Sequence, residues 1–280
     1  MIASMAGFAI EDAVIKQLSY SMPVSQVLLL IGCGGVLTFA VTAMLTHVRL
    51  FAAEVTKPWF VIRTVSELAS AIFFVIAIVY ASLSASSAIL QATPLAVSLA
   101  AALFLKEHVS GRQWILIAIG FVGVLCVIQP GLDGFNPAAL FAIVGVMFLA
   151  LRDAITRSIS VSIPAVAVSF WAFFALLMAG VVSIPFFADF TPVTLEHLGL
   201  LVVSTAAGTG AYFCIVMATR GGDVAVVAPF RYTRLLFALG LAVIFFDEDV
   251  NVMMILGSSL IIGSGIVMIV SSGSRRKQIH

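Results

Sequence analysis

Long apolar runs alternate with short polar stretches along the whole of this chain. A helix needs about 20 predominantly apolar residues to cross the hydrocarbon core of a bilayer. The runs are continuous and lack the two-residue alternation typical of a membrane β-barrel. We therefore expect ten membrane-spanning helices, at residues 1–20, 24–46, 59–80, 85–105, 112–130, 137–156, 162–187, 195–218, 223–246 and 250–271.

The first run is the least regular, because Glu11, Asp12 and Lys16 interrupt it. The apolar region of a secretory signal peptide would not carry two adjacent acidic residues, so that interpretation is excluded. The alternative to ten spans is nine spans preceded by a segment that lies on the membrane surface.

Composition agrees with a membrane protein. Hydrophobic residues make up 62% of the chain and charged residues 10%, against about 45–50% and about 25% in an ordinary soluble domain. A soluble globule of this size needs a polar shell that the sequence does not supply. The expected fold class is an all-α polytopic membrane protein.

The sequence gives little support to other classes of function. Cys33, Cys126 and Cys214 are scattered within apolar runs, where cysteine usually packs as a small apolar residue. The histidines lack the spacing of metal ligands, and the sequence contains none of the phosphate-binding or nucleophile motifs of common enzymes. We therefore expect no cofactor, no metal and no catalytic residues, and no nucleic-acid partner because no basic face is visible.

The charges of the expected loops segregate by side. Lys and Arg collect in cytoplasmic loops. One side holds Arg49, Lys57, Lys106, Arg112, Arg152, Arg157, Arg220, Arg275, Arg276 and Lys277. The other side holds Asp133, Asp189, Glu196, Asp247, Glu248 and Asp249. We expect both termini in the cytoplasm and expect most of these charges only to set orientation.

Ten spans divide into two sets of five, which we assign to residues 1–131 and 132–280. An odd number of spans per set inverts the second set in the membrane, an arrangement common in secondary transporters. The run Phe-Leu-Lys-Glu that ends at Glu107 closes the fourth span, and Phe-Phe-Asp-Glu that ends at Glu248 closes the ninth. This similarity supports two inverted repeats.

Residues 80–131, from Tyr-Ala-Ser-Leu-Ser-Ala-Ser-Ser through Phe-Leu-Lys-Glu to Gln-Pro-Gly, resemble the EamA repeat of the drug/metabolite transporter superfamily. Residues 217–270 resemble a degenerate second copy. The resemblance implies ten helices in two inverted repeats, a bacterial inner-membrane location and transport of small metabolites. Arg63 and the pair Arg152-Asp153 are most similar to the branch that transports S-adenosylmethionine.

Arg63 and Glu67 lie four residues apart in one apolar run, so they share a helix face. A charged side chain at bilayer depth is costly and usually faces a cavity or a partner. One interpretation is an ion pair that fixes packing, and the other is a pair that lines a transport cavity. Arg63 is close enough to the end of its span to extend to the cytoplasmic surface, so Glu67 is the stronger candidate.

Glu11 and Asp12 point in directions about 100° apart on a helix, so at most one faces a narrow cavity directly. Asp12 shares a face with Lys16, and one interpretation is a local ion pair near the outer surface. Glu11 then has no local partner. We expect Glu11 or Glu67 to couple transport to protons.

Arg231 and Arg234 lie roughly eight to eleven residues into the span that begins at residue 223. The planar guanidinium group suits carboxylate or phosphate oxygens. With the neighbouring Tyr232, these arginines form a candidate site for an anionic group of the substrate. The alternative is neutralisation by acidic residues of the first and third spans.

Gln91 and Trp171 are further candidates. Gln91 can hydrogen-bond a ligand or a neighbouring helix. Trp171 lies deep in its span, where it can form part of a cavity wall, although tryptophan in spans is more often an interface anchor.

These patterns predict a secondary transporter for a small polar metabolite, amino-acid-like or nucleoside-metabolite-like and carrying a carboxylate, that works by alternating access. A passive channel and a membrane-embedded enzyme remain the alternatives. The expected partners are the substrate, protons and the lipid bilayer. The expected substrate-binding residues are Arg231, Arg234, Glu67, Glu11, Tyr232, Gln91, Trp171 and Arg63.

Overall fold

The computed structural model describes residues 1–104, 109–131, 135–157, 163–187, 189–221 and 228–276. Within these ranges every regular element is a helix. The expected positions Lys106, Glu107, Asp133 and Lys277 lie outside the described residues.

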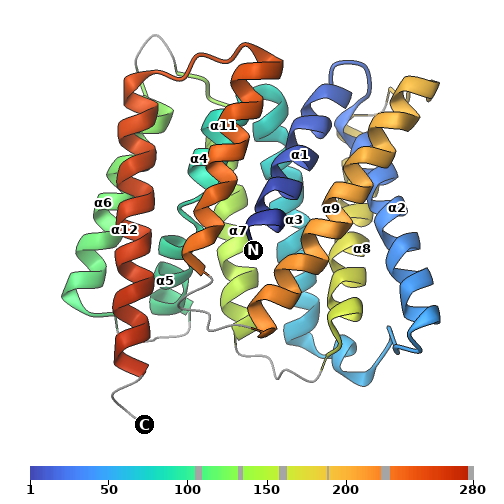
Figure 1. Cartoon of the computed structure of the whole chain (residues 1–280), viewed down its shortest axis with the longest axis horizontal. Helices are drawn as coiled ribbons and strands as arrows, with labels where there is room; N and C mark the ends of the chain where they lie inside the picture. The colour runs from blue at the N-terminus through green and yellow to red at the C-terminus, as the bar shows by residue number, and fades with distance from the viewer. Residues whose placement is uncertain (105–108, 132–134, 158–162, 188, 222–227, 277–280) are drawn as a thin grey trace.

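The helices run roughly side by side in one bundle (Figure 1). The α-helices are α1 (Ile2–Leu18), α2 (Val24–Leu45), α3 (Pro58–Tyr80), α4 (Leu83–Leu90), α5 (Thr93–Phe104), α6 (Gly111–Ile128), α7 (Ala139–Arg157), α8 (Ala165–Ser183), α9 (Leu195–Gly221), α11 (Thr233–Phe246) and α12 (Val252–Arg276). Short 3-10 helices are η1 (Ala53–Thr56), η2 (Ile184–Phe186) and η3 (Ala228–Tyr232).

The number of described spans is smaller than the ten expected. Eight of the described helices are long and apolar enough to cross a membrane, and the bent pair of α4 and α5 would make a ninth. The bend between these two helices is 42°. The remaining helix, α1, has 17 residues, which corresponds to a length of about 26 Å.

The short helix α1 belongs to the interior of the bundle. It packs along α9 and α11 (Figure 1), and residues along its whole length are buried, including Met5, Ala9 and Leu18. The alternative of a segment that lies apart on the membrane surface therefore does not describe α1.

Helix pairs join the two parts of the chain. The helix α2 packs against α8, α3 against α7, and α6 against α12. Two further pairs are α1 with α9 and α5 with α7. Each of these pairs combines a helix that precedes residue 131 with one that follows it.

Close contact between α2 and α8 depends on two glycines. A Cβ atom added to Gly32 would lie 2.4 Å from the backbone nitrogen of Leu177, and one added to Gly180 would lie 2.4 Å from the backbone nitrogen of Leu29. The two contacts are reciprocal. Small residues that let helix backbones approach are a common basis of helix association in membranes.

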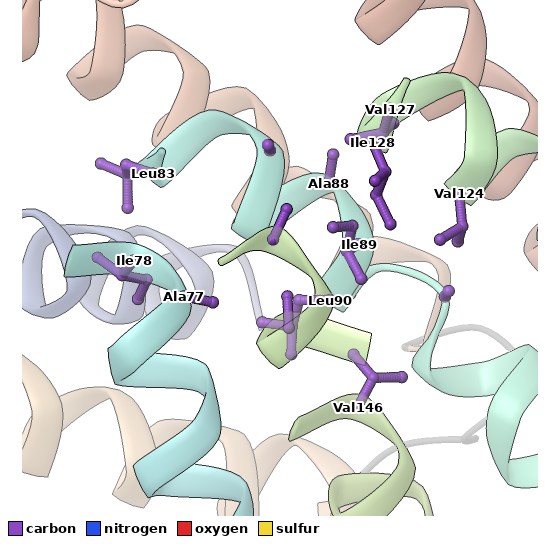
Figure 2. Packing of buried hydrophobic residues seen from close by; sticks show 14 of the residues in the cluster. Ala77, Ile78, Leu83, Ala88, Ile89, Leu90, Val124, Val127, Ile128 and Val146 are labelled. Atoms are coloured by element: carbon purple, nitrogen blue, oxygen red, sulfur yellow. The ribbon is translucent and has the colours of Figure 1, made fainter. Parts of the chain in front are cut away.

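The bent pair is held in place by packing around α4. All eight residues of α4 are buried, and apolar side chains from neighbouring helices enclose it (Figure 2). The labelled side chains in that view are Ala77, Ile78, Leu83, Ala88, Ile89, Leu90, Val124, Val127, Ile128 and Val146. This packing fixes the position of Gln91, which directly follows α4.

Candidate functional site

A cavity of about 540 Å³ lies between helices from both parts of the chain. Apolar side chains form much of its wall, but charged and polar groups converge on it from α1, α3, α7, α9 and α11. The polar lining residues are Glu11, Asp12, Arg63, Glu67, Ser70, Gln91, Thr93, Arg152, Asp153, Thr156, Tyr212, Arg231, Tyr232 and Arg234. A concave apolar site with a few convergent polar groups is typical of small-molecule binding.

A chain of alternating charges crosses one part of the cavity. Arg63 Nη2 lies 3.1 Å from Glu67 Oε2, and Arg152 Nη1 lies 2.8 Å from Glu67 Oε1. Arg152 Nε lies 2.9 Å from Asp153 Oδ1, and Asp153 Oδ2 lies 3.8 Å from Arg231 Nη1. The predicted ion pair between Arg63 and Glu67 is therefore present, as part of a larger network.

Hydroxyl groups bind the same network. Arg63 donates from Nη2 to the Tyr212 hydroxyl at 3.3 Å and from Nε to Thr156 Oγ1 at 3.2 Å. The Tyr212 hydroxyl donates to Glu67 Oε1 at 3.2 Å. Arg63 is only 2% exposed, so it is held inside the cavity and does not extend to the cytoplasmic surface.

The second charged group of the cavity is an ion pair between α1 and α11. Arg234 donates to Asp12 Oδ2 from Nη2 at 2.6 Å and from Nε at 3.2 Å. Its guanidinium carbon lies 5.0 Å from the ring centroid of Phe8 and 5.7 Å from that of Phe74. Cation–π contacts at these distances add to the attraction between the two charges. The charge of Arg234 is therefore largely neutralised.

Glu11 faces the cavity without such a partner. Its side chain is buried, and among the described residues no hydrogen bond or ion pair to its carboxylate is present. The carboxylate packs against α9, where a Cβ atom added to Gly208 would overlap with its oxygens. A buried carboxylate usually has a bonding partner, so a ligand or a proton is the natural complement of Glu11.

Two neutral side chains at helix breaks also lack partners. Gln91 follows α4, and Tyr232 ends η3 where α11 begins. Gln91 Nε2 and the Tyr232 hydroxyl are buried and have no hydrogen-bond partner among the described residues. The Tyr232 hydroxyl reaches α12, where a Cβ atom added to Gly265 would overlap with it. Broken helices that present polar groups to a cavity are a feature of transporter binding sites.

Seven of the eight expected site residues line this cavity, and Trp171 does not. Trp171 Nε1 donates to the backbone oxygen of Leu50 at 3.0 Å. Its ring packs against Phe51, Phe60 and Phe174 with centroid distances of 5.8, 5.8 and 5.1 Å. Trp171 therefore belongs to an aromatic cluster outside the cavity, and its depth in the span reflects packing.

Two charges have roles that differ from those expected. Arg152 lies inside α7 and lines the cavity, so it is not a loop charge that sets orientation. Lys16 forms its ion pair with Glu248, and Asp12 pairs with Arg234, so the interpretation of Asp12 and Lys16 as a local pair does not hold. For Lys16 and Asp12, partners distant in the sequence take the place of the local one.

Asp153, Thr156 and Tyr212 line the cavity but were not among the expected binding residues. Asp153 had a detectable signal, because it is an acidic residue next to Arg152 near the end of an apolar run. Tyr212 stood out as a tyrosine within an apolar run, but tyrosine in spans is most often an interface anchor, and Thr156 had no signal because small hydroxyl residues are common in membrane helices.

Solved structures and curated proteins provide a comparison. A crystal structure with 18% sequence identity superposes with a TM-score of 0.63 over 95% of this chain and 97% of the other, which shows the fold alone. An S-adenosylmethionine uptake transporter of Rickettsia bellii is 28% identical over 64% of this chain and 60% of its own length. The chain thus spans about 60% of the length of this relative.

Two further relatives carry other names. The pseudopaline exporter CntI of Pseudomonas aeruginosa is 24% identical over 91% of this chain and 89% of its own length. A riboflavin transporter of Rhizobium johnstonii is 26% identical over 68% of this chain and 63% of its own length. The family model described as "EamA-like transporter family" matches residues 1–129 and again residues 136–271. The chain therefore belongs to the EamA-like transporter family.

Proposed function

We propose that this protein is a secondary transporter that moves a small polar metabolite across the bacterial inner membrane by alternating access. The observation that carries the proposal is a charged cavity enclosed by helices from both parts of the chain. Relatives named for the transport of S-adenosylmethionine, pseudopaline and riboflavin support a small-metabolite substrate.

The substrate carries a carboxylate, and Arg231 is its main contact. The side chain of Arg231 is 35% exposed, and its one described ion pair, to Asp153, is long at 3.8 Å. Arg234 is less available, because Asp12 already binds it at 2.6 Å. A guanidinium with free donors suits a carboxylate. Arg231 is therefore the main anion-binding residue, and Arg234 has a smaller part in binding the substrate.

Charge balance supports an amino-acid-like or nucleoside-metabolite-like substrate that also has a cationic group. Four arginines and four carboxylates line the cavity, so a substrate with no net charge preserves its neutrality. Arg231 and Glu11 are the two groups of opposite sign that are incompletely neutralised by described residues. A zwitterionic substrate can bind Arg231 through its carboxylate and Glu11 through its cationic group.

Reciprocal contacts support two inverted repeats, residues 1–131 and 132–280. Gly32 packs on Leu177, and Gly180 packs on Leu29, with the same spacing of three residues in each helix. In two equivalent repeats, α1 corresponds to α7 and α9 corresponds to α3. The contact between α1 and α9 then matches the contact between α7 and α3. A rocking motion of one half against the other would then open the cavity alternately. The expected orientation has both termini in the cytoplasm.

We further propose that protons drive transport through Glu11. Glu67, the other expected proton carrier, already forms ion pairs with both Arg63 and Arg152. Glu11 has no such partner among the described residues. A change in its protonation therefore requires no ion pair to break.

A counterflow experiment in proteoliposomes tests the proposal. Liposomes loaded with unlabelled amino acids or nucleoside metabolites should accumulate the matching labelled solute in a saturable manner. Arg231→Ala should reduce substrate affinity at least tenfold, which is about 1.4 kcal/mol. Arg112→Ala is the control, because Arg112 is exposed at the start of α6. Non-saturating flux would indicate a channel, and normal affinity in Arg231→Ala would refute the assignment of that residue.

A further inference from the structure

Glu248 joins three elements on one side of the cavity. It lies in the turn between α11 and α12, and its carboxylate accepts hydrogen bonds from Lys16 Nζ at 2.5 Å and from Ser84 Oγ at 2.6 Å. The backbone amides of Leu83 and Ser84 also donate to it, at 2.7 and 2.9 Å. All the described donors belong to the first half of the chain, and the acceptor belongs to the second half.

These bonds lie at the end of the bundle opposite the C-terminus. The helix α12 begins just after Glu248 and runs to the other end, where the chain terminates (Figure 1). Hydrogen bonds to an ionised group are about twice as strong as those between neutral groups. The α4 N-terminus adds a favourable dipole. Glu248 therefore holds the two halves together at this end.

A buried polar track leads from Glu248 to the cavity along α4. Ser84, Ser87 and Gln91 are spaced three and four residues apart, so they lie on one face of the helix. Ser84 binds Glu248, and Gln91 lines the cavity. Ser87 is fully buried between them, and in the part of the chain that the structure describes neither its hydroxyl nor Gln91 Nε2 has a hydrogen-bond partner. Native proteins rarely leave such groups unpaired in the interior.

A second and shorter polar track between the cavity and Glu248 runs along α1. Asp12 lines the cavity and binds Arg234, and Lys16 lies one turn further on the same face and binds Glu248. The four residues from Asp12 to Lys16 advance about 6 Å along the helix, and the seven residues from Ser84 to Gln91 advance about 10 Å. The protein layer between the cavity and the hydrogen bonds of Glu248 is therefore only about 6–10 Å thick along these two helices.

The geometry points to Glu248 as the latch of a closed access route, which runs along α1 and α4 from the cavity to the face opposite the C-terminus. This inference rests on the proposed alternating access. Opening that face separates the two halves, so the bonds to Lys16 and α4 must break. Water then enters along the track, and the hydroxyl of Ser87 and the amide of Gln91 obtain the partners that they lack in the closed state.

Labelling of a single cysteine tests the latch without a transport assay. Ser87→Cys is introduced into protein in which Cys33, Cys126 and Cys214 are replaced by alanine. A membrane-impermeant maleimide is then added from the face opposite a C-terminal tag. With Glu248 intact, Cys at position 87 should react slowly. In Glu248→Gln it should react at least roughly tenfold faster, because the charge-assisted bonds are lost.

Two controls make the result decisive. Asp249→Asn removes an exposed carboxylate from the same turn and should leave the labelling rate unchanged. Tyr20→Cys, at an exposed position of the same end, should react rapidly in every background. Gel filtration in detergent verifies that each variant is folded.

Equal labelling of position 87 in folded Glu248→Gln and in its parent would overturn the latch. Rapid labelling in the parent would overturn it as well, because the route would already be open. Absence of counterflow in the wild-type protein would instead contradict the proposed transport, whatever the labelling shows.

Discussion

Arg234 Nη2 lies 2.6 Å from Asp12 Oδ2 although the two residues are 222 positions apart in the chain. The contact joins α1 to α11 and forms part of the cavity wall. Both side chains are mostly buried, with 16% and 6% exposure for Arg234 and Asp12. Their charges are therefore acceptable only as a pair.

Removal of one partner should cost more stability than removal of both. Asp12→Asn leaves Arg234 buried without its counter-ion, and we expect a loss of about 3–5 kcal/mol in the free energy of unfolding. The double variant Asp12→Asn with Arg234→Met should recover most of this loss, because no charge stays unpaired. Thermal unfolding in detergent measures both effects. Additive losses in the double variant would contradict coupling between the residues.

The proposed proton coupling predicts different effects for two carboxylates. Glu11→Gln should flatten the dependence of transport rate on pH, because the group that would exchange the proton is gone. Glu67→Gln should retain a pH dependence, since Glu67 is engaged in ion pairs with Arg63 and Arg152 and is not the proposed proton carrier. Initial rates of uptake between about pH 5 and 8 distinguish the two, across the range in which a perturbed carboxyl can titrate. A wild-type pH profile in both variants would refute proton coupling through either residue.

Glu248 should make the protein sensitive to acid. Burial alone raises the pKa of this carboxyl, but hydrogen bonds from Lys16, Ser84 and the amides of Ser84 and Leu83 outweigh it and hold the pKa below its ordinary value. A carboxyl whose pKa is lowered by folding stabilises the protein above its unfolded pKa of about 4.3, and this contribution is lost as the pH falls through the lower folded pKa.

The measurement is the difference in melting temperature between the wild-type protein and Glu248→Gln. We expect the wild type to be more stable at pH 7, by about 1.5–3 kcal/mol, and the difference to shrink below about pH 4. Asp249→Asn, in the same turn, should show no comparable difference at any pH. A difference for Glu248→Gln that grows as the pH falls would have the wrong sign for this explanation.

The depth of the charges was predictable from the sequence, whereas their partners were not. Glu11 and Arg231 stand out because charges are rare in the apolar runs. The partner of Lys16 is Glu248, which is 232 positions away. Asp12 is also acidic and lies only four residues from Lys16, so the sequence does not favour Glu248 as the partner. Arg152 was counted with the cytoplasmic charges although it lies four residues inside the expected span 137–156, and α7, which ends at Arg157, keeps it within the helix.

The break between α4 and α5 had a local signal. Pro94 lies in the first turn of α5, and proline is favoured at that position because its missing N–H group needs no partner there. The expected single span over residues 85–105 therefore consists of two helices, α4 and α5. The unpaired hydroxyl of Ser87 had no such signal, because it depends on how helices distant in the sequence enclose α4.

The reciprocal glycines of α2 and α8 lead to a prediction about stability. Gly32→Ala would place a methyl group 2.4 Å from the backbone of Leu177, and Gly180→Ala would place one 2.4 Å from the backbone of Leu29. Backbone atoms cannot rotate away as a side chain can, so the helices must separate. We expect each variant to lose about 1–3 kcal/mol, as for other overpacked sites.

Gly210→Ala is the matched control on α9, because a Cβ atom at Gly210 would have no neighbour within 4 Å. Alanine is favoured over glycine inside a helix by up to about 1 kcal/mol, so this variant should be neutral or slightly more stable. Thermal unfolding in one detergent compares the three proteins. If Gly32→Ala and Gly180→Ala melt at the same temperature as Gly210→Ala, the two helices do not depend on close backbone contact, and the support that these glycines give to a two-fold repeat is lost.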